Sequence, residues 1–271
     1  MHGIGNDFMI IDARESLPRL SADLIKLLSN RHLGVGFDQL AVIYSSDSSD
    51  AGAHLKFWNS DGSTSPTCGN ASRCIAQMLM NEKNVSKLNL KTDSGILTCE
   101  RNEEGIVSIN MGLPKFLWSE IPLAVECETL HLPLEGDPVA TNVGNPHCTF
   151  FVDDIEKFDI EYFGKTYETH LLFPNRTNVQ LAQLVEQNTL RVKVWERGAG
   201  KTLASGSSSC AVAVAANRRG LVEKKVRVLL DGGELEIFYS DKGVWMSGET
   251  SEIYSGIISE DFLSKAETLL K

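Results

Sequence analysis

Short strings of the sequence recur in the same order at a nearly constant offset. Gly5–Phe8 reads GNDF, and Gly144–His147 reads GNPH 139 positions later. Asp93–Leu97 (DSGIL) precedes Asp231–Leu235 (DGGEL) by 138 positions. Because this offset is about half of the chain, far longer than the period of a solenoid, it predicts an internal duplication with two similar domains.

The repeated string that carries chemistry is a Cys-Gly pair. Nine positions separate Asn59 from Cys68, and nine also separate Glu196 from Ser205. Cys68 and its counterpart Ser205 are each followed by glycine and, within six residues, by another cysteine. The duplication therefore aligns a cysteine of the first half with a serine of the second.

Local patterns predict the same kind of structure in both halves. Alternating apolar and polar residues predict strands over Lys87–Thr92 and Leu190–Trp195. Ala71–Asn84 and Ser208–Arg219 are predicted to be helices, the second ending before a glycine. The expected fold class is α+β, with two pseudo-symmetric domains that each have a mostly antiparallel sheet around a conspicuous helix.

Domain borders follow from the repeat and from the loops. Residues 1–113 are expected to form the N-terminal half and residues 114–251 the C-terminal half, with the segment 252–271 packing back on the first. The serine-rich stretch Tyr44–His54 is predicted to be a loop. Leu113–Pro138 is predicted to join the halves.

Composition excludes several function classes. The formal net charge of −10 disfavours binding to nucleic acid or to anionic membranes, which both need clustered cations. The longest unbroken apolar run, Cys210–Ala216, is far too short to span a bilayer. Without a signal-peptide pattern, six cysteines are better interpreted as cytosolic thiols than as a disulfide framework. We therefore expect a cytoplasmic protein.

The Cys-Gly pair lies where a loop is predicted to enter a helix, with Asn70 as a favoured N-cap. The first N–H groups of a helix can hold a carboxylate, and the same position favours the thiolate form of a cysteine. Two such sites suit the inversion of an α-carbon that bears a carboxylate. One group removes the proton from one face, and the other group delivers a proton to the opposite face.

Plainer interpretations of these residues stay open. Cys68 could be a small buried apolar residue, and its spacing to Cys74 does not match a zinc site. His147 could be an ordinary turn histidine, and the pair Glu196-Arg197 a surface ion pair. The glycine-rich segment 197–202 lacks the spacing of a phosphate-binding loop.

Together, the motifs resemble those of the pyridoxal-independent diaminopimelate epimerases along the whole chain. The opening string MHGIGNDF, GFDQ at 36–39, and NSDGS leading to CGNASRC at 68–74 resemble the first half of the family pattern. GNPH at 144–147, RTN at 176–178 and ERGAG at 196–200 resemble the second half. The resemblance implies a site in the cleft between two domains, no cofactor, a homodimer, and interconversion of LL- and meso-diaminopimelate for lysine and cell-wall synthesis.

The resemblance also implies roles for single residues. Cys68 and the residue at position 205 would be the acid/base pair, and His147 and Glu196 would tune their proton affinities. Arg197 would hold the distal carboxylate through its bidentate fork. The other expected substrate-binding residues are Asn6, Gln39, Asn59, Gly69, Asn70, Asn145, Asn178, Glu196, Gly206 and Ser207.

Three positions depart from the family pattern. Ser205 stands where members carry the second cysteine, which predicts a crippled enzyme, and Lys201 replaces the usual acid. Members usually have part of a first strand before the opening string, so a trimmed start is expected. Two alternatives stay open: a cofactor-independent racemase of the same fold with another amino-acid substrate, and a non-catalytic relative that binds an amino acid.

Overall fold

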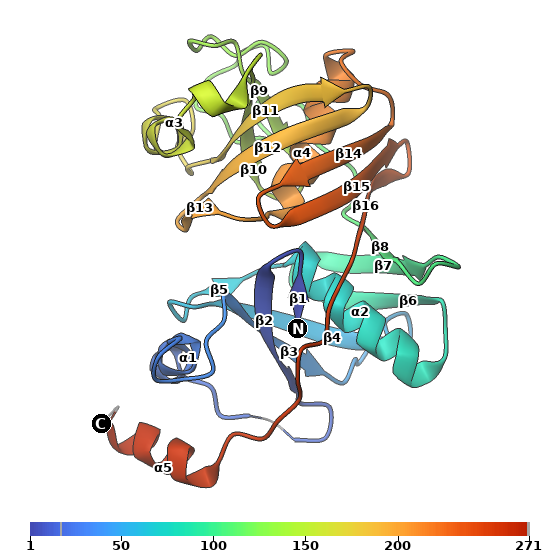
Figure 1. The fold of residues 1–271 in the computed structure, drawn as a ribbon, viewed down its shortest axis with the longest axis vertical. Coiled ribbons are helices and arrows are strands. Elements are labelled where there is room, and N and C mark those ends of the chain that lie inside the picture. The colour runs from blue at the N-terminus through green and yellow to red at the C-terminus, as the bar shows by residue number, and fades with distance from the viewer. Residues whose placement is uncertain (17, 270–271) are drawn as a thin grey trace. The chain divides into compact units, whose positions relative to one another are not determined.

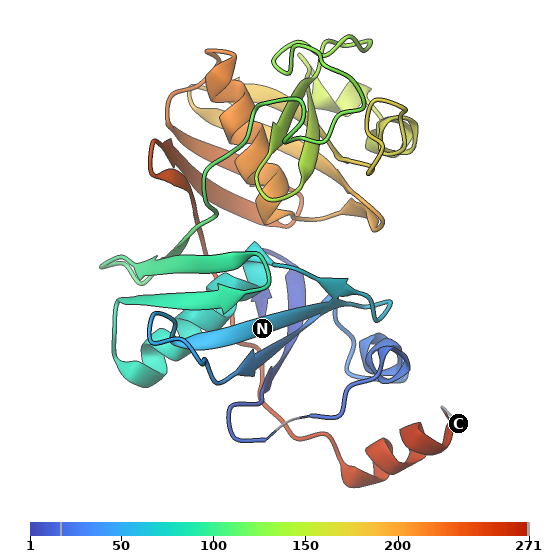
Figure 2. The same cartoon turned by 180° about the vertical axis from the view of Figure 1, so that it is seen from behind.

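The computed structural model describes residues 1–16 and 18–269, and the chain divides into two compact units (Figures 1 and 2). Unit 1 comprises Met1–Val107 and the segment from Glu249 onward, and unit 2 comprises Ser108–Gly248. The border lies after Val107 because most of strand β8 (Val107–Asn110) belongs with β16 (Gly243–Gly248), its partner in the sheet. Among the described residues, no helix is long and apolar enough to cross a membrane.

Unit 1 is a mixed sheet with three helices in the described part of the chain. Strands β2 and β3, and strands β4 and β6, pair in parallel, while the remaining pairs within the unit are antiparallel. The strands are β1 (His2–Gly3), β2 (Asn6–Asp12), β3 (Gln39–Tyr44), β4 (Ala53–Asn59), β5 (Thr64–Ser65), β6 (Lys87–Thr92) and β7 (Gly95–Arg101). The helices are α1 (Ala22–Ser29), α2 (Gly69–Lys83) and α5 (Glu260–Leu269).

Unit 2 repeats this plan. Its strands are β8, β9 (Val139–Asn142), β10 (Pro146–Phe151), β11 (Asn178–Glu186), β12 (Thr189–Glu196), β13 (Gly200–Thr202), β14 (Lys225–Leu230), β15 (Gly233–Ser240) and β16. Its helices are the short 3₁₀ helix η1 (Ile155–Lys157), α3 (Ile160–Tyr167) and α4 (Gly206–Arg218). Strands β10 and β11, and strands β12 and β14, pair in parallel, as β2 and β3 and then β4 and β6 do in unit 1.

The correspondence extends to several elements next to these pairs. The short strands β5 and β13 each pair with the strand before them, and α2 and α4 follow directly. Helices α1 and α3 occupy the matching connections between the first two parallel strands. This shared order confirms the predicted duplication and the predicted α+β class.

Helix α4 forms the centre of unit 2. Its residues from Ser208 to Ala216 are all buried, as expected for a helix that is apolar on every side. It contacts β9, β10, β11, β15 and β16, so the sheet curves around it (Figure 2). In unit 1, α2 has the matching place and contacts β1, β2, β6 and β7.

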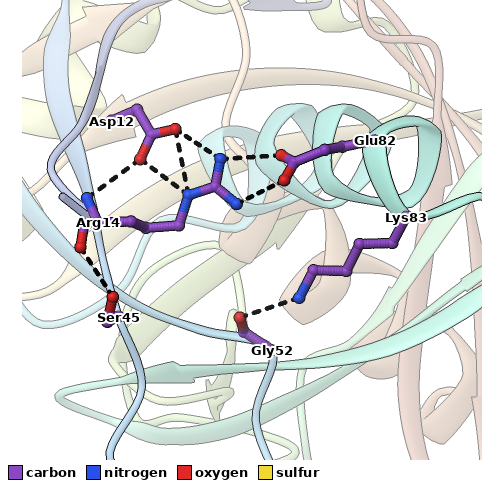
Figure 3. Close-up of polar contacts among 6 residues, drawn as sticks. All are labelled: Asp12, Arg14, Ser45, Gly52, Glu82 and Lys83. Atoms are coloured by element: carbon purple, nitrogen blue, oxygen red, sulfur yellow. Dashed lines mark hydrogen bonds and ion pairs between the residues drawn. The ribbon is translucent and has the colours of Figure 1, made fainter.

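A cluster of polar contacts around Arg14 and Lys83 fixes the C-terminal end of α2 (Figure 3). The guanidinium of Arg14, just after β2, makes two hydrogen bonds of 2.8 Å to Glu82 near the end of α2. It also contacts Asp12 at 2.6 Å, and its hydrogen bonds lower the pKa of that carboxyl group. Lys83 binds the carbonyl of Gly52 at 3.3 Å. These bonds set the direction of the helix whose other end begins at Cys68.

The segment Leu113–Pro138 does not act as a connector between the units. It has no strand or helix, yet Ile121, Leu123 and Leu132 lie in the hydrophobic core of unit 2 with Phe150 and Leu181. Thr129 also donates a hydrogen bond to the carbonyl of Phe116 within the same segment. The prediction of a linker was wrong because irregular segments with isolated apolar residues can cover a core without any periodic pattern.

Gly164 of α3 is expected to be the glycine whose substitution costs unit 2 the most stability. A Cβ atom there would lie 2.1 Å from the ring of Trp195 on β12. Gly164→Ala should therefore lower the free energy of unfolding by about 1–3 kcal/mol, although alanine is the better helix former by roughly 1 kcal/mol. Urea denaturation measures this loss. Thr166→Ala, on an exposed position of the same helix, is the control and should change stability by at most about 0.5 kcal/mol.

Candidate active site

Cys68 and Ser205 begin the two central helices with nearly the same backbone. Cys68 has φ −144° and ψ 110°, and Ser205 has φ −144° and ψ 119°. The sulfur of Cys68 accepts the N–H of Ala71 at 3.5 Å, and the hydroxyl of Ser205 accepts the N–H of Ser208 at 3.5 Å. Both residues are therefore N-caps, and the prediction that Asn70 caps α2 was wrong because the helix begins one residue before it.

The two helix starts have the features of an anion site. The first turn of each helix lacks an acidic residue of its own. Gly69 and Asn70 in one helix, and Gly206 and Ser207 in the other, supply the first backbone N–H groups at the positive end of the dipole. Each start can thus bind a carboxylate beside the capping side chain.

Asn70 connects the start of α2, here called the Cys68 corner, to Asn6 at the start of β2; the start of α4 at Ser205 is the corresponding Ser205 corner. Its Nδ2 donates to Oδ1 of Asn6 at 3.3 Å, and its own Oδ1 accepts from Nη2 of Arg73 at 2.8 Å. Arg73 is fully buried and also binds the backbone carbonyl of Glu249 at 3.3 Å. The structure therefore brings the predicted residues Asn6 and Asn70 together, held from within the core by an arginine.

Gln39 and Asn59 lie side by side at the ends of β3 and β4. They are register partners in the sheet, and Nε2 of Gln39 donates to Oδ1 of Asn59 at 2.8 Å. Asn59 in turn donates to Ser63 at 3.0 Å. Asp38, the residue directly before Gln39, accepts from Nδ2 of Asn6 at 2.9 Å. The predicted polar side chains of unit 1 thus form two bonded pairs, Asn6 with Asn70 and Gln39 with Asn59.

In unit 2, the hydroxyl of Ser205 donates to Oε2 of Glu196 at 2.9 Å. Ser205 is almost fully buried, whereas Cys68 is partly exposed. A carboxylate this close is the neighbour that a serine hydroxyl needs if it is to give up its proton. Cys68 and Ser205 thus have the same backbone conformation but differ in the reacting atom and in how exposed the residue is.

Asn178 holds the backbone of the loop that carries Arg197. Oδ1 of Asn178 accepts the N–H of Arg197 at 3.0 Å, and its Nδ2 donates to the carbonyl of Pro146 at 2.8 Å. The buried carboxylate of Glu168 accepts from the indole of Trp195 at 2.7 Å and from the N–H of Gly198 at 2.9 Å. Both bonds fix the turn on which Arg197 stands exposed.

His147 is completely buried between two amide side chains. Nε2 lies 2.8 Å from Oδ1 of Asn145, and Nδ1 lies 2.9 Å from Nε2 of Gln180. Burial and, to a smaller extent, the positive charge of Arg197 together lower the pKa of His147 to about 3. The ring is therefore neutral at physiological pH.

Arg73, Glu168 and Gln180 are among the polar residues around the site that the sequence analysis did not assign to it. Their only sequence signal is position, since Gln180 lies two residues after Asn178 on one strand and therefore on the same face. Arg73 contacts Asn70 on its own helix but also the distant Glu249, and Glu168 contacts Trp195 and Gly198 far along the chain; no local pattern indicates these long-range contacts. Their place becomes evident only from the fold.

A family comparison agrees with the motifs. The model of the family "Diaminopimelate epimerase" matches residues 1–117 and 139–253. The chain belongs to the diaminopimelate epimerase family. The internal stretch between the two matched parts, 118–138, lies within the irregular segment that covers the core of unit 2.

Curated diaminopimelate epimerases match almost the whole chain. The protein from Acidiphilium cryptum is 41% identical over 269 residues, which cover 97% of this chain and 96% of the relative. The protein from Erythrobacter litoralis is 43% identical over 263 residues and covers 94% of each. The family is one of isomerases, so the chain belongs to an enzyme family.

Solved structures outside the diaminopimelate epimerases share the fold. A PhzF-family phenazine biosynthesis protein from Bacillus anthracis aligns with a TM-score of 0.63 at 14% identity, over 92% of this chain and 91% of that one. A hydroxyproline epimerase from Agrobacterium vitis aligns with a TM-score of 0.61 at 13% identity, over 91% and 87%. At this identity they show the fold alone.

Proposed function

We propose that the protein interconverts LL- and meso-2,6-diaminopimelate by proton transfer at the α-carbon between two groups, Cys68 and Ser205. The observation that carries this proposal is the pair of matched helix starts, each with a capping side chain beside N–H groups that can bind a carboxylate. The family and its relatives support the choice of substrate. The reaction belongs to lysine and peptidoglycan precursor synthesis in the cytoplasm, and the protein acts as a homodimer.

The proposed mechanism needs both corners at one α-carbon. One corner removes the α-proton, and the negative charge that develops spreads into the carboxylate, where the N–H groups of Gly69-Asn70 and Gly206-Ser207 stabilise it. The other corner delivers a proton to the opposite face, which inverts the carbon. Pyridoxal phosphate has no step in this scheme, since the helix starts supply the stabilisation that a Schiff base would otherwise give.

The remaining polar residues hold the substrate. Arg197 binds the distal carboxylate, while His147 and Glu196 set the proton affinities of the acid/base pair. The side chains assigned to the other polar groups of the substrate are Asn6, Gln39, Asn59, Asn145 and Asn178. In the chain as it stands, Ser205 makes turnover slow, because a hydroxyl is a far weaker acid than a thiol.

The test follows the α-proton directly. Incubation with LL-diaminopimelate in D₂O, followed by NMR and chiral chromatography, separates exchange of the α-proton from inversion. We expect slow formation of the meso isomer and no exchange with proline or hydroxyproline, which lack the second carboxylate. Exchange with proline but not with diaminopimelate would contradict the proposed substrate.

Ser205 also favours a second candidate function, that of a non-catalytic amino-acid-binding protein. This alternative predicts tight binding of diaminopimelate without any exchange of its α-hydrogen, even after a cysteine is introduced at position 205. Calorimetric binding together with the exchange assay separates the two functions.

Arg197→Lys should weaken the binding of diaminopimelate while leaving the fold intact. The side chain of Arg197 is exposed. Its Nη1 donates to the backbone carbonyl of Asn175 at 3.1 Å. An ammonium group cannot reproduce a planar bidentate contact, so roughly 1–3 kcal/mol of affinity should be lost. Isothermal titration calorimetry measures the change. An unaltered dissociation constant would remove Arg197 from the site.

A further inference from the structure

A chain of buried polar side chains joins β10 and β11 to the start of α4. Thr149, His147, Gln180 and Ser208 are all fully buried. The hydroxyl of Thr149 donates to Oε1 of Gln180 at 3.1 Å. Nε2 of Gln180 donates to Oγ of Ser208 at 3.1 Å and lies 2.9 Å from Nδ1 of His147. Both ends of the Gln180 amide are therefore engaged within this chain of contacts.

These bonds determine which nitrogen of His147 carries the proton. A neutral imidazole has one donor and one acceptor nitrogen. The amide nitrogen of Gln180 can only donate, so Nδ1 of His147 accepts its bond. The ring proton then lies on Nε2, which donates to Oδ1 of Asn145 at 2.8 Å. The amide of Asn145 is thereby fixed with its oxygen toward the ring and its Nδ2 toward Ser207, whose Oγ is 3.5 Å away.

We infer that Gln180 is a positioning residue for the candidate active site, since it fixes the Nε2–H tautomer of His147 and so turns the N–H groups of Asn145 toward the start of α4. A carboxylate bound at Gly206 and Ser207 gains a side-chain donor from this arrangement. His147 then serves as a neutral support that keeps its Nε2 proton and neither takes up nor releases a proton during turnover. The part of the inference that concerns substrate rests on the proposed function, whereas the tautomer does not.

The tautomer is tested first in the protein as it is. Long-range ¹H–¹⁵N NMR distinguishes protonated from unprotonated ring nitrogens, and the His147 signals are identified by their loss in His147→Asn. We expect a protonated Nε2 and an unprotonated Nδ1 at neutral pH. A ring protonated on Nδ1, or on both nitrogens, overturns the inference.

The coupling to the substrate is tested with Gln180→Met, which keeps the length of the side chain but cannot donate. We expect the His147 ring to populate both tautomers and the dissociation constant for diaminopimelate to rise about tenfold, as for the loss of one oriented hydrogen bond. Gln183→Met is the matched control. Gln183 lies on the same strand, and its Oε1 accepts the N–H of Ile155 outside this network. Its replacement should therefore change neither the tautomer of His147 nor the dissociation constant for diaminopimelate.

The outcomes separate the inference from the proposed function. An unchanged tautomer in Gln180→Met, or an equal loss of affinity in both variants, overturns the positioning role of Gln180. If the starting protein binds no diaminopimelate, the proposed function fails, while the NMR comparison still decides whether Gln180 fixes the ring.

Discussion

Ser205→Cys is expected to raise the rate of conversion of LL- to meso-diaminopimelate at least about a thousandfold, which corresponds to roughly 4 kcal/mol in the activation barrier. A thiol with an ordinary pKa of about 8.5 ionises readily at a helix N-terminus, whereas a hydroxyl depends on a neighbouring base. Glu196, 2.9 Å from the hydroxyl of Ser205, provides such a base but leaves the hydroxyl a poor proton acceptor. The serine form should therefore be slow but not inert.

Steady-state assays of the meso product measure the difference, and calorimetry shows whether both forms bind substrate equally. Ser205→Ala is the matched control, because it removes the hydroxyl while leaving the helix in place. It should bind diaminopimelate and show no inversion. Equal turnover of the serine and cysteine forms would disprove the mechanism with two acid/base groups. Failure of the serine form to bind would mean that residue 205 shapes the site instead.

Cys68→Ala is expected to abolish exchange of the substrate α-hydrogen with solvent, a loss of at least about a thousandfold. Cys68 is partly exposed and its sulfur lies at the N-terminus of α2, where an anion is stabilised. Deuterium incorporation from D₂O, followed by NMR, measures exchange even where inversion is slow. The exchange assay therefore measures proton removal by Cys68 separately from proton delivery by the residue at position 205.

Cys74→Ala and Cys210→Ala are the controls for this prediction. Both side chains are fully buried, and burial raises the pKa of Cys74 to about 11, which keeps it in the thiol form. Their replacement should reduce stability by roughly 1 kcal/mol and leave exchange in the folded protein unchanged. If all three variants were folded and lost exchange equally, Cys68 would have no special role.

Much of the fold could be predicted from the sequence because the duplication leaves a direct trace. The strand predicted over Lys87–Thr92 coincides with β6, and the two predicted helices agree with α2 and α4 to within two residues at each end. Helix starts were less accurate, since Cys is an unusual N-cap and Asn70 has the preferred type. Bonds across strands, such as that from Gln180 to His147, require the register of β10 and β11, which sequence alone does not fix.

The capping role of residues 68 and 205 has a consequence for how such a protein can change over time. Serine is among the best helix N-caps, so a serine at either corner closes its helix at least as well as a cysteine does. Folding therefore sets no barrier against exchanging sulfur for oxygen at these two positions. Selection for stability alone does not distinguish serine from cysteine at these positions. Only selection for rapid proton transfer would retain a thiol at both of them.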